Sequence, residues 1–459
     1  LELFLIILPV LFSGLSEAIA ESTIPGAEPV FLASVAPGSA AEKAGLATGD
    51  RLLRWRVPAG QGVPAAEGVF LSPWDPAFLE CEASARGFAE ITVRRSDGEK
   101  TVTIRPGTWN LSAKPELSPD IEALYAGSKQ HTQQGRLKEG VDLLQQAALL
   151  AEAGEHTLEA AWLHFWVAET ARKSQSPELC GEALAKACHL AKATRITRLR
   201  ASLLEWQGRL RFFQRDLPGS IDSIKQAVSV WEQSPEHCFQ LARILISLGK
   251  IYQQQGEIES AGQQYKRALT LAELGVPDNL LSAEAHQQCG TVAWWRSEFD
   301  TAVAHFQKAL SIHRRLAPGE SAEAFDLNCL GLVSWRKGDL AAAESYFRDS
   351  LTIRQKIDPG SIDTATSVNN LGLVCLYQGD FTEAEHFFRQ ALDISRKADP
   401  GGTFEAQFLQ NLGIVAAERG DLAKAEWYYN QSTSVFERLA PGRLELAHAL
   451  NHEAIVAHD

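Results

Sequence analysis

Two stretches of this chain repeat each other without a gap. Residues 330–361 read LGLVSWRKGDLAAAESYFRDSLTIRQKIDPGS, and residues 371–402 read LGLVCLYQGDFTEAEHFFRQALDISRKADPGG. Their second residues, Gly331 and Gly372, lie 41 positions apart, and we call this place in the repeat the marker position. Steps of 41 or 40 lead on to Gly413, Gly290, Gly249, Gly208, Ala168 and Ser128. A constant period of this length is typical of proteins built from stacked structural repeats.

Each repeat predicts two antiparallel helices. Two apolar stripes of helical period flank a Gly-Asp turn, as at Gly338-Asp339, where glycine can take a left-handed C-cap and aspartate can cap the next helix. A small residue follows the marker by twelve positions and an aromatic residue by sixteen, as at Ala384 and Phe388. We expect the small residue to let the helices approach and the aromatic to fill the space against the next repeat. No repeat can bury its apolar face alone, so the repeats must stack.

This pattern resembles tetratricopeptide repeats, in the longer variant found in kinesin light chains. The resemblance covers residues 117–459 and implies a mainly α fold, a right-handed α-solenoid of eight helix pairs. Residues 451–459 begin the first helix of a ninth repeat. Because that helix lacks a partner and a polar cap, we expect the natural protein to continue.

The resemblance also implies a concave groove lined by the first helix of each repeat. The groove positions lie three before the marker and one, four and five after it. Asparagines recur two or three positions before the marker, at Asn328, Asn369, Asn370, Asn411 and Asn451. A ladder of side-chain amides can pair with an extended peptide backbone whatever its sequence, because each offers a donor and an acceptor. The alternative is that these asparagines link neighbouring repeats.

Large aromatic residues occupy the positions four and five after the marker, among them Trp294, Trp335 and Tyr377. An aromatic stripe at helical spacing usually belongs to a core. The resemblance places the core aromatics elsewhere in the repeat, so we expect these three to face the groove and anchor apolar side chains of a ligand. The predicted partner is a protein or peptide.

Residues 26–107 predict a small α+β domain. The run VAPGSAAEKAGLATGDRLL at 35–53, and a hairpin signal at Asp97-Gly98 between two strand-like runs, resemble PDZ domains. The resemblance implies that a peptide adds as an extra strand, its carboxylate held by the preceding loop, here residues 26–29. Pro29 cannot donate a hydrogen bond there and Glu28 would repel a carboxylate. The alternative is a structural module that spaces the repeats from a membrane.

The first twenty residues predict a signal peptide or a membrane anchor. Residues 1–15 are apolar, and the small residues Ala18 and Ala20 follow them as at a cleavage site. Because fifteen residues are few for crossing a bilayer, we expect export to the periplasm or the extracellular space, with an anchor or a buried helix as alternatives. A cytoplasmic location is also compatible with the sequence.

Composition and motifs favour binding over chemistry. The net charge of -13 provides no basic face for nucleic acid. The sequence contains no G-x-S-x-G elbow, Walker loop, H-E-x-x-H or Rossmann fingerprint. We therefore expect no catalytic residue, cofactor or metal. The cysteines that fall in apolar helical patterns are expected to be small buried hydrophobes, namely Cys180, Cys188, Cys238, Cys289, Cys329 and Cys375.

Together these features predict a scaffold or sensor that binds a peptide or protein in its groove and is not itself catalytic. The combination also resembles the N-terminal half of bacterial proteins that end in a CHAT domain, a caspase-like cysteine peptidase. In that alternative, this chain is the regulatory or substrate-recognition half and the enzyme lies beyond Asp459.

Overall fold

A computed structural model describes residues 29–439 except 60–64, 72, 74, 77–78, 81–82, 84–86, 106–108, 195, 234–237 and 275–277. The chain divides into two compact units, Leu1–Gln288 and Cys289–Asp459, and each is considered by itself. The predicted signal peptide at residues 1–20, residues 26–28 of the predicted carboxylate loop and Asn451 lie outside the described residues. Within the part of the chain that is described, no helix is long and apolar enough to cross a membrane.

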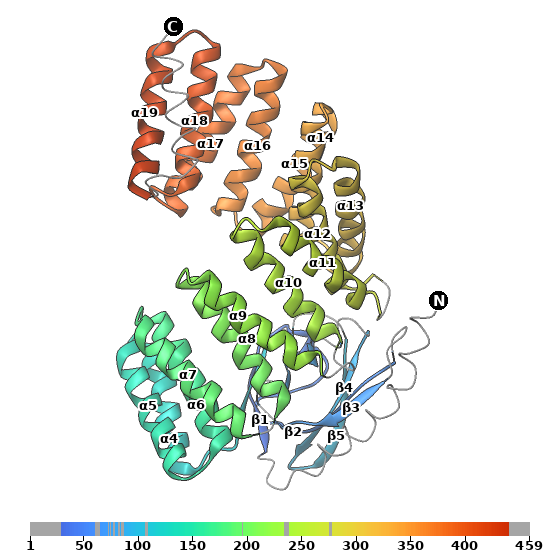
Figure 1. Cartoon of the computed structure of the whole chain (residues 1–459), viewed down its shortest axis with the longest axis vertical. Coiled ribbons are helices and arrows are strands. Elements are labelled where there is room, and N and C mark those ends of the chain that lie inside the picture. The colour runs from blue at the N-terminus through green and yellow to red at the C-terminus, as the bar shows by residue number, and fades with distance from the viewer. Residues whose placement is uncertain are drawn as a thin grey trace. The chain divides into compact units, whose positions relative to one another are not determined.

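The first unit begins with an antiparallel sheet, blue in Figure 1. Its strands are β1 (Val30–Val35), β2 (Arg51–Val57), β3 (Ala66–Val69), β4 (Ala89–Arg95), β5 (Gly98–Ile104) and β6 (Leu111–Pro115). They lie in the order β5-β4-β2-β1-β6, and β3 pairs with β2. The short helix α2 (Ala40–Lys43) follows β1 and starts at Ser39, whose hydroxyl accepts from the Glu42 amide. The predicted β4–β5 hairpin is present, but its loop is Ser96-Asp97, one residue before the predicted Asp97-Gly98.

Strand β6 was not predicted, and it changes the interpretation of the small domain. Along its length, from Val30↔Pro115 to Val35↔Leu111, β1 pairs with β6 on one side, while β2 pairs with it on the other. The Glu116 amide extends this pairing by donating to the Pro29 carbonyl at 2.9 Å. A peptide could add to this edge of β1 only by displacing β6. The edge that the PDZ resemblance predicts for peptide binding is therefore already paired.

Sixteen helices follow the sheet in the described residues and form successive antiparallel pairs. The first unit holds α4 (Pro119–Gln133), α5 (Leu137–Ala153), α6 (Thr157–Lys173), α7 (Pro177–Ala193), α8 (Thr197–Phe213), α9 (Leu217–Trp231), α10 (Cys238–Gln254) and α11 (Ile258–Ala272). α12 (Leu280–Trp295) leads into the second unit, which holds α13 (Phe299–Leu316), α14 (Ser321–Arg336), α15 (Leu340–Ile357), α16 (Ile362–Gln378), α17 (Phe381–Ala398), α18 (Thr403–Glu418) and α19 (Leu422–Leu439). A mainly helical array of helix pairs preceded by a small antiparallel sheet confirms the predicted fold class.

The turns within the pairs follow the predicted chemistry. Gly338 and Gly379 have φ of 82° and 80°, in the left-handed region that glycine enters without strain. The next residues cap the second helices: Asp339 accepts from the Ala342 amide at 3.0 Å and Asp380 from the Glu383 amide at 3.1 Å. One repeat earlier, Ser297 fills the glycine position at φ 60°, where a side chain costs energy.

Marker glycines allow the two helices of a pair to pack closely. A Cβ on Gly372 would lie 2.6 Å from Phe388 Cε1, and one on Gly331 would lie 2.5 Å from Phe347 Cε1. The recurrent aromatic therefore packs over the marker of its own repeat, and this contact adds to the predicted packing against the next repeat. Phe347 also belongs to a buried cluster with Leu371 of the following repeat.

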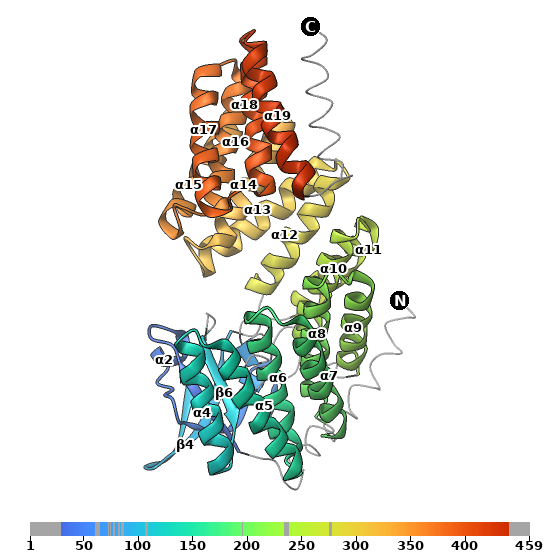
Figure 2. The ribbon, with the colours of Figure 1, turned by 90° about the vertical axis from the view of Figure 1, so that its left-hand side faces the viewer.

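In the first unit the sheet and the helices share one core. Leu71, just after β3, is buried in the cluster formed by helices α4 to α8. Arg198 of α8 lies 3.6 Å from the buried Asp75 carboxylate and over the Trp55 ring of β2. Figure 2 shows β6 alongside α4 and α6. The small domain is therefore packed against the first repeats through apolar and charged contacts.

Candidate functional site

The most exposed large hydrophobic side chains among the described residues share one repeat position. They are Phe213, Tyr377 and Trp295, which are 70%, 62% and 61% exposed. Each lies five residues after a marker, the last of the predicted groove positions. Large aromatics normally bury most of their area, so their recurrent exposure makes this repeat position a candidate contact surface.

In the second unit, four side chains from the ends of three first helices form a continuous group, which we call the aromatic row: Trp294, Trp335, Arg336 and Tyr377. These residues belong to α12, α14 and α16, the first helices of successive pairs (Figure 1). The sequence predicted its three aromatics but not Arg336, although position five after the marker could have identified it.

Ring contacts hold the aromatic row together. The Arg336 guanidinium lies 5.8 Å from the Trp294 ring centre and 5.6 Å from that of Trp335, and so bridges the two indoles. Trp335 meets Tyr377 edge to face, with ring centres 5.2 Å apart. Trp294 also packs against Phe299 at 5.6 Å. Trp294 and Trp335 are half-buried against the repeats, whereas Tyr377 is exposed. The row is therefore packed on the repeats on one side and accessible to solvent on the other.

Arg336 carries the positive charge of the aromatic row. In the described part of the second unit it makes no ion pair, whereas the adjacent Lys337 is neutralised by Asp300 at 2.7 Å. Its guanidinium is exposed and keeps its N–H groups for an incoming acceptor, since contacts with ring faces leave the edge of the group open.

The predicted asparagine ladder links repeats. Asn370 donates to Asn328 Oδ1 at 2.8 Å, and Asn411 donates to Asn369 Oδ1 at 2.7 Å, in each case across to the previous repeat. Asn328, Asn369 and Asn370 are each less than a tenth exposed. The structure therefore favours the alternative in which asparagines join neighbouring repeats, and their contact with a peptide stays a prediction.

In the first unit, a charged residue three positions before the marker links neighbouring repeats. Glu205 lies three before the marker Gly208 and is 3% exposed. Its carboxylate accepts from Arg209 at 2.6 Å on its own helix and from Arg243 at 2.7 Å on α10. Burial alone would raise the pKa of Glu205, but the two guanidinium groups outweigh it and hold the pKa below its usual range. The i,i+4 pair of Glu205 and Arg209 is visible in the sequence, but Arg243 lies 38 residues from Glu205, so its part in this triad could not be predicted.

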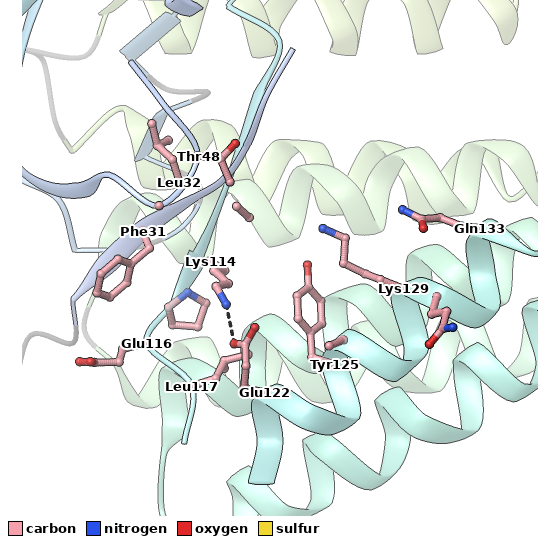
Figure 3. A pocket seen from close by; sticks show the side chains of 15 residues that line it. Phe31, Leu32, Thr48, Lys114, Glu116, Leu117, Glu122, Tyr125, Lys129 and Gln133 are labelled. Atoms are coloured by element: carbon pink, nitrogen blue, oxygen red, sulfur yellow. Dashed lines mark hydrogen bonds and ion pairs between the residues drawn. The ribbon is translucent and has the colours of Figure 1, made fainter. Parts of the chain in front are cut away.

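A pocket lies in the first unit between β1, β6 and α4 (Figure 3). Its volume is about 610 Å³, and its lining includes Phe31, Thr48, Lys114, Glu116, Leu117, Glu122, Tyr125 and Lys129. Lys114 pairs with the Glu122 carboxylate, and the Lys129 ammonium lies 5.6 Å from the Tyr125 ring centre. Burial raises the pKa of Tyr125 to about 12. Because two carboxylates balance the two lysines, the charges of this lining do not select one class of ligand.

Four of the described thiols are poor nucleophiles. Burial raises the pKa of Cys188 to about 11 and also raises the pKa values of Cys180 and Cys375. His313 Nδ1 lies 2.6 Å from Asp326 Oδ2 in the core, and Asp326 adds to the burial that raises the pKa of Cys329. A nucleophilic cysteine needs the opposite environment. Among the described residues no group of three or more His, Cys, Asp or Glu could hold a metal ion.

A family model matches part of the helical repeats. The family model for tetratricopeptide repeats matches residues 199–274, 240–315 and 320–397, which include the aromatic row. No curated protein matches the sequence.

Several solved structures resemble the chain at low identity. The apo form of RapI is 17% identical with a TM-score of 0.50, over 61% of this chain and 99% of RapI. BtubC from P. vanneervenii is 21% identical with a TM-score of 0.42, over 52% of this chain and 93% of BtubC. A Rap protein complexed with competence and sporulation factor is 15% identical with a TM-score of 0.44, over 74% and 97%. The likeness to RapI supports the fold of the repeats.

Proposed function

From the premise that this is a tetratricopeptide-repeat protein, we propose that its second unit binds an extended segment of another polypeptide along the aromatic row. The observation that carries the proposal is the row itself: Trp294, Trp335 and Tyr377 line up through ring contacts and the Arg336 bridge. Such repeats generally mediate protein–protein interactions, and aromatic and arginine side chains supply most of the energy of such contacts.

The physical argument rests on pre-organisation. Trp335 is held by Tyr377 on one side and Arg336 on the other, so little side-chain freedom remains to be lost when a ligand docks. Tyr377 remains 62% exposed and would lose its apolar area to the ligand. Burying a side chain of this size contributes about 1.5–3 kcal/mol.

The proposal treats the chain as a binding protein without catalytic residues of its own. The raised pKa values of the thiols support this, because such thiols remain protonated near neutral pH. The buried His313–Asp326 pair joins α13 to α14 and has no open side for a substrate, since the two residues are 4% and 0% exposed.

Selection from a random peptide display library against the whole chain tests the proposal. The strongest selected peptide is then titrated by calorimetry against the unaltered protein and against Trp335→Ala and Tyr377→Ala. Each substitution removes about 1.5–3 kcal/mol of contact at the centre of the row, so Kd is expected to rise at least tenfold.

Trp427→Ala provides the matched control. Trp427 is 54% exposed in the same unit but lies on α19, a second helix, outside the row. Its removal should leave Kd within about twofold. Equal losses for Trp427→Ala and Trp335→Ala, or no loss for either row variant, would defeat the proposal.

A further inference from the structure

Arg336 determines which ligand suits the aromatic row. Building on the proposed function, we infer that the bound segment carries an aspartate or glutamate side chain that pairs with Arg336, flanked by apolar residues on the rings of the row. Three features lead to this inference: the contact of the guanidinium with two indoles, its lack of a counter-charge among the described residues, and its place within the row.

A ligand that covers the row also covers Arg336. The exposed guanidinium lies over the rings of Trp294 and Trp335, at 5.8 Å and 5.6 Å from their centres, so the charge and the apolar area belong to one surface. Covering the two indoles therefore removes water from the guanidinium as well. A charged group that loses its water without gaining a partner is strongly unfavourable. A tightly bound ligand must supply that partner.

Arg209 on α8 shows the same stacking with its counter-charge in place. Its guanidinium lies 5.5 Å from the Trp206 ring centre and donates to the Glu205 carboxylate at 2.6 Å. Arg209 keeps this carboxylate although its side chain is 43% exposed. In the described part of the second unit, Arg336 has the stacking without an ion pair. The comparison indicates that the group to be supplied by the ligand is a carboxylate.

A carboxylate suits this guanidinium in geometry and in charge. A guanidinium stacked on rings keeps the edge of its flat N–H fork for an acceptor, and the two oxygens of a carboxylate match that fork. A phosphate group carries about 1.5 to 2 negative charges, so a single guanidinium would leave part of its charge unbalanced. The chain has a net charge of -13 and offers no general attraction for anions, so recognition depends on Arg336 itself.

The place of Arg336 within the row favours a side-chain carboxylate over a chain end. Trp294 lies on α12, one repeat before Arg336 on α14, and Tyr377 lies on α16, one repeat after it. Trp335 connects the two sides, since it contacts Arg336 and also meets Tyr377 at 5.2 Å between ring centres. A segment that covers the whole row therefore continues past Arg336 in both directions.

Peptide selection followed by a double-mutant cycle tests the inference. A random peptide library, joined to a carrier protein at its C-terminal end so that no peptide has a free carboxylate there, is selected against the whole chain. The strongest selected peptide is made with an amidated C-terminus, and each of its acidic residues is replaced in turn by the corresponding amide. Calorimetry measures Kd for every peptide with the unaltered protein and with Arg336→Gln, Trp335→Ala and Tyr377→Ala.

Lys356→Gln provides the matched control. It removes the same charge from an exposed residue of α15, a second helix outside the row. Circular dichroism of each variant establishes that its helices remain folded.

The inference predicts that one acidic residue of the peptide is coupled to Arg336. Its replacement should raise Kd about tenfold with the unaltered protein, because charge-assisted hydrogen bonds are about twice as strong as neutral ones. Arg336→Gln should raise the Kd of the acidic peptide by a similar factor and change that of the amide peptide by less than about twofold. Lys356→Gln should leave every Kd within about twofold.

The inference is wrong if the selected peptide has no acidic residue, or if Arg336→Gln changes the Kd of the acidic and the amide peptides by the same factor. It is also wrong if Lys356→Gln has the same effect as Arg336→Gln. In each case the proposed function stands as long as Trp335→Ala and Tyr377→Ala raise Kd at least tenfold. If neither aromatic variant changes Kd, the proposed function is wrong and the inference falls with it.

Discussion

Glu205→Gln tests whether charged groups on the groove side tie the repeats of the first unit together. The substitution keeps the shape of the side chain and removes its charge. Glu205 is 3% exposed and joins Arg209 on α8 to Arg243 on α10. Without the carboxylate, Arg209 and Arg243 lose the counter-charge that they share across the repeat boundary.

The expected loss follows from the burial of each partner. Removing one member of a buried ion pair costs about 3–5 kcal/mol. Arg243 and Arg209 retain 30% and 43% side-chain exposure, so water offsets part of that cost. We therefore expect Glu205→Gln to lower the free energy of unfolding of the first unit by about 2–4 kcal/mol at pH 7.

The effect should also depend on pH. The folded-state pKa of Glu205 is lowered, so its stabilisation is present above the unfolded pKa of about 4.3 and is lost as pH falls through the folded value. The difference between the unaltered protein and Glu205→Gln should therefore shrink as the pH is lowered below about 4.

Urea unfolding followed by circular dichroism, with hydrogen exchange of the α8 and α10 amides, measures this loss. Glu284→Gln is the control, because Glu284 pairs with Lys250 across a repeat boundary in the same unit but both side chains are exposed. That variant should change stability by less than about 0.5–1 kcal/mol. A loss below about 0.5 kcal/mol for Glu205→Gln, or equal losses for both variants, would refute the reasoning.

Three further substitutions test the packing and the turns. Ser297→Gly removes the backbone strain of a side chain at φ 60° and should stabilise the second unit by about 1 kcal/mol. The midpoint of urea unfolding should rise, and a lower midpoint would show that Ser297 is not strained. Phe388→Ala empties the space over the marker Gly372 and should lower the free energy of unfolding of the second unit by about 3–5 kcal/mol. A loss below about 1 kcal/mol in the same assay would show that this contact does not stabilise the core. Asn370→Ala leaves Asn328 without its partner and should cost about 1–3 kcal/mol in the second unit, and unchanged stability would show that asparagines do not link the repeats.

Sequence periodicity was sufficient to predict the helix pairs. A marker glycine is needed wherever an aromatic ring such as Phe347 lies over the helix, so the constraint recurs in the five repeats from Gly249 to Gly413 and is visible without a structure. The same holds for turns such as Gly379-Asp380, where each residue has a defined backbone or capping role. Local chemistry that recurs at a fixed interval is the kind of information a single sequence carries best.

Pairing between distant residues could not be predicted in this way. The β1–β6 pairing joins segments about 80 residues apart, and LSAKP at 111–115 has neither strict alternation nor β-branched residues. Likewise, Asn370 has equal capacity to bond a peptide or a neighbouring asparagine, and its bond to Asn328 becomes visible only in the structure. Position five after the marker places Arg336 among the predicted groove residues, but the sequence does not show that it lies over two indoles.

The indole groups offer the most direct test of the binding surface. The chain has 11 tryptophans, so 5-fluorotryptophan labelling gives a fluorine NMR spectrum in which single Trp→Phe variants assign Trp294, Trp335 and Trp427. On addition of the strongest display-selected peptide, the signals of Trp294 and Trp335 should shift together and saturate at one equivalent, while that of Trp427 stays in place. Saturation of binding with the Trp294 and Trp335 signals unmoved would contradict the account.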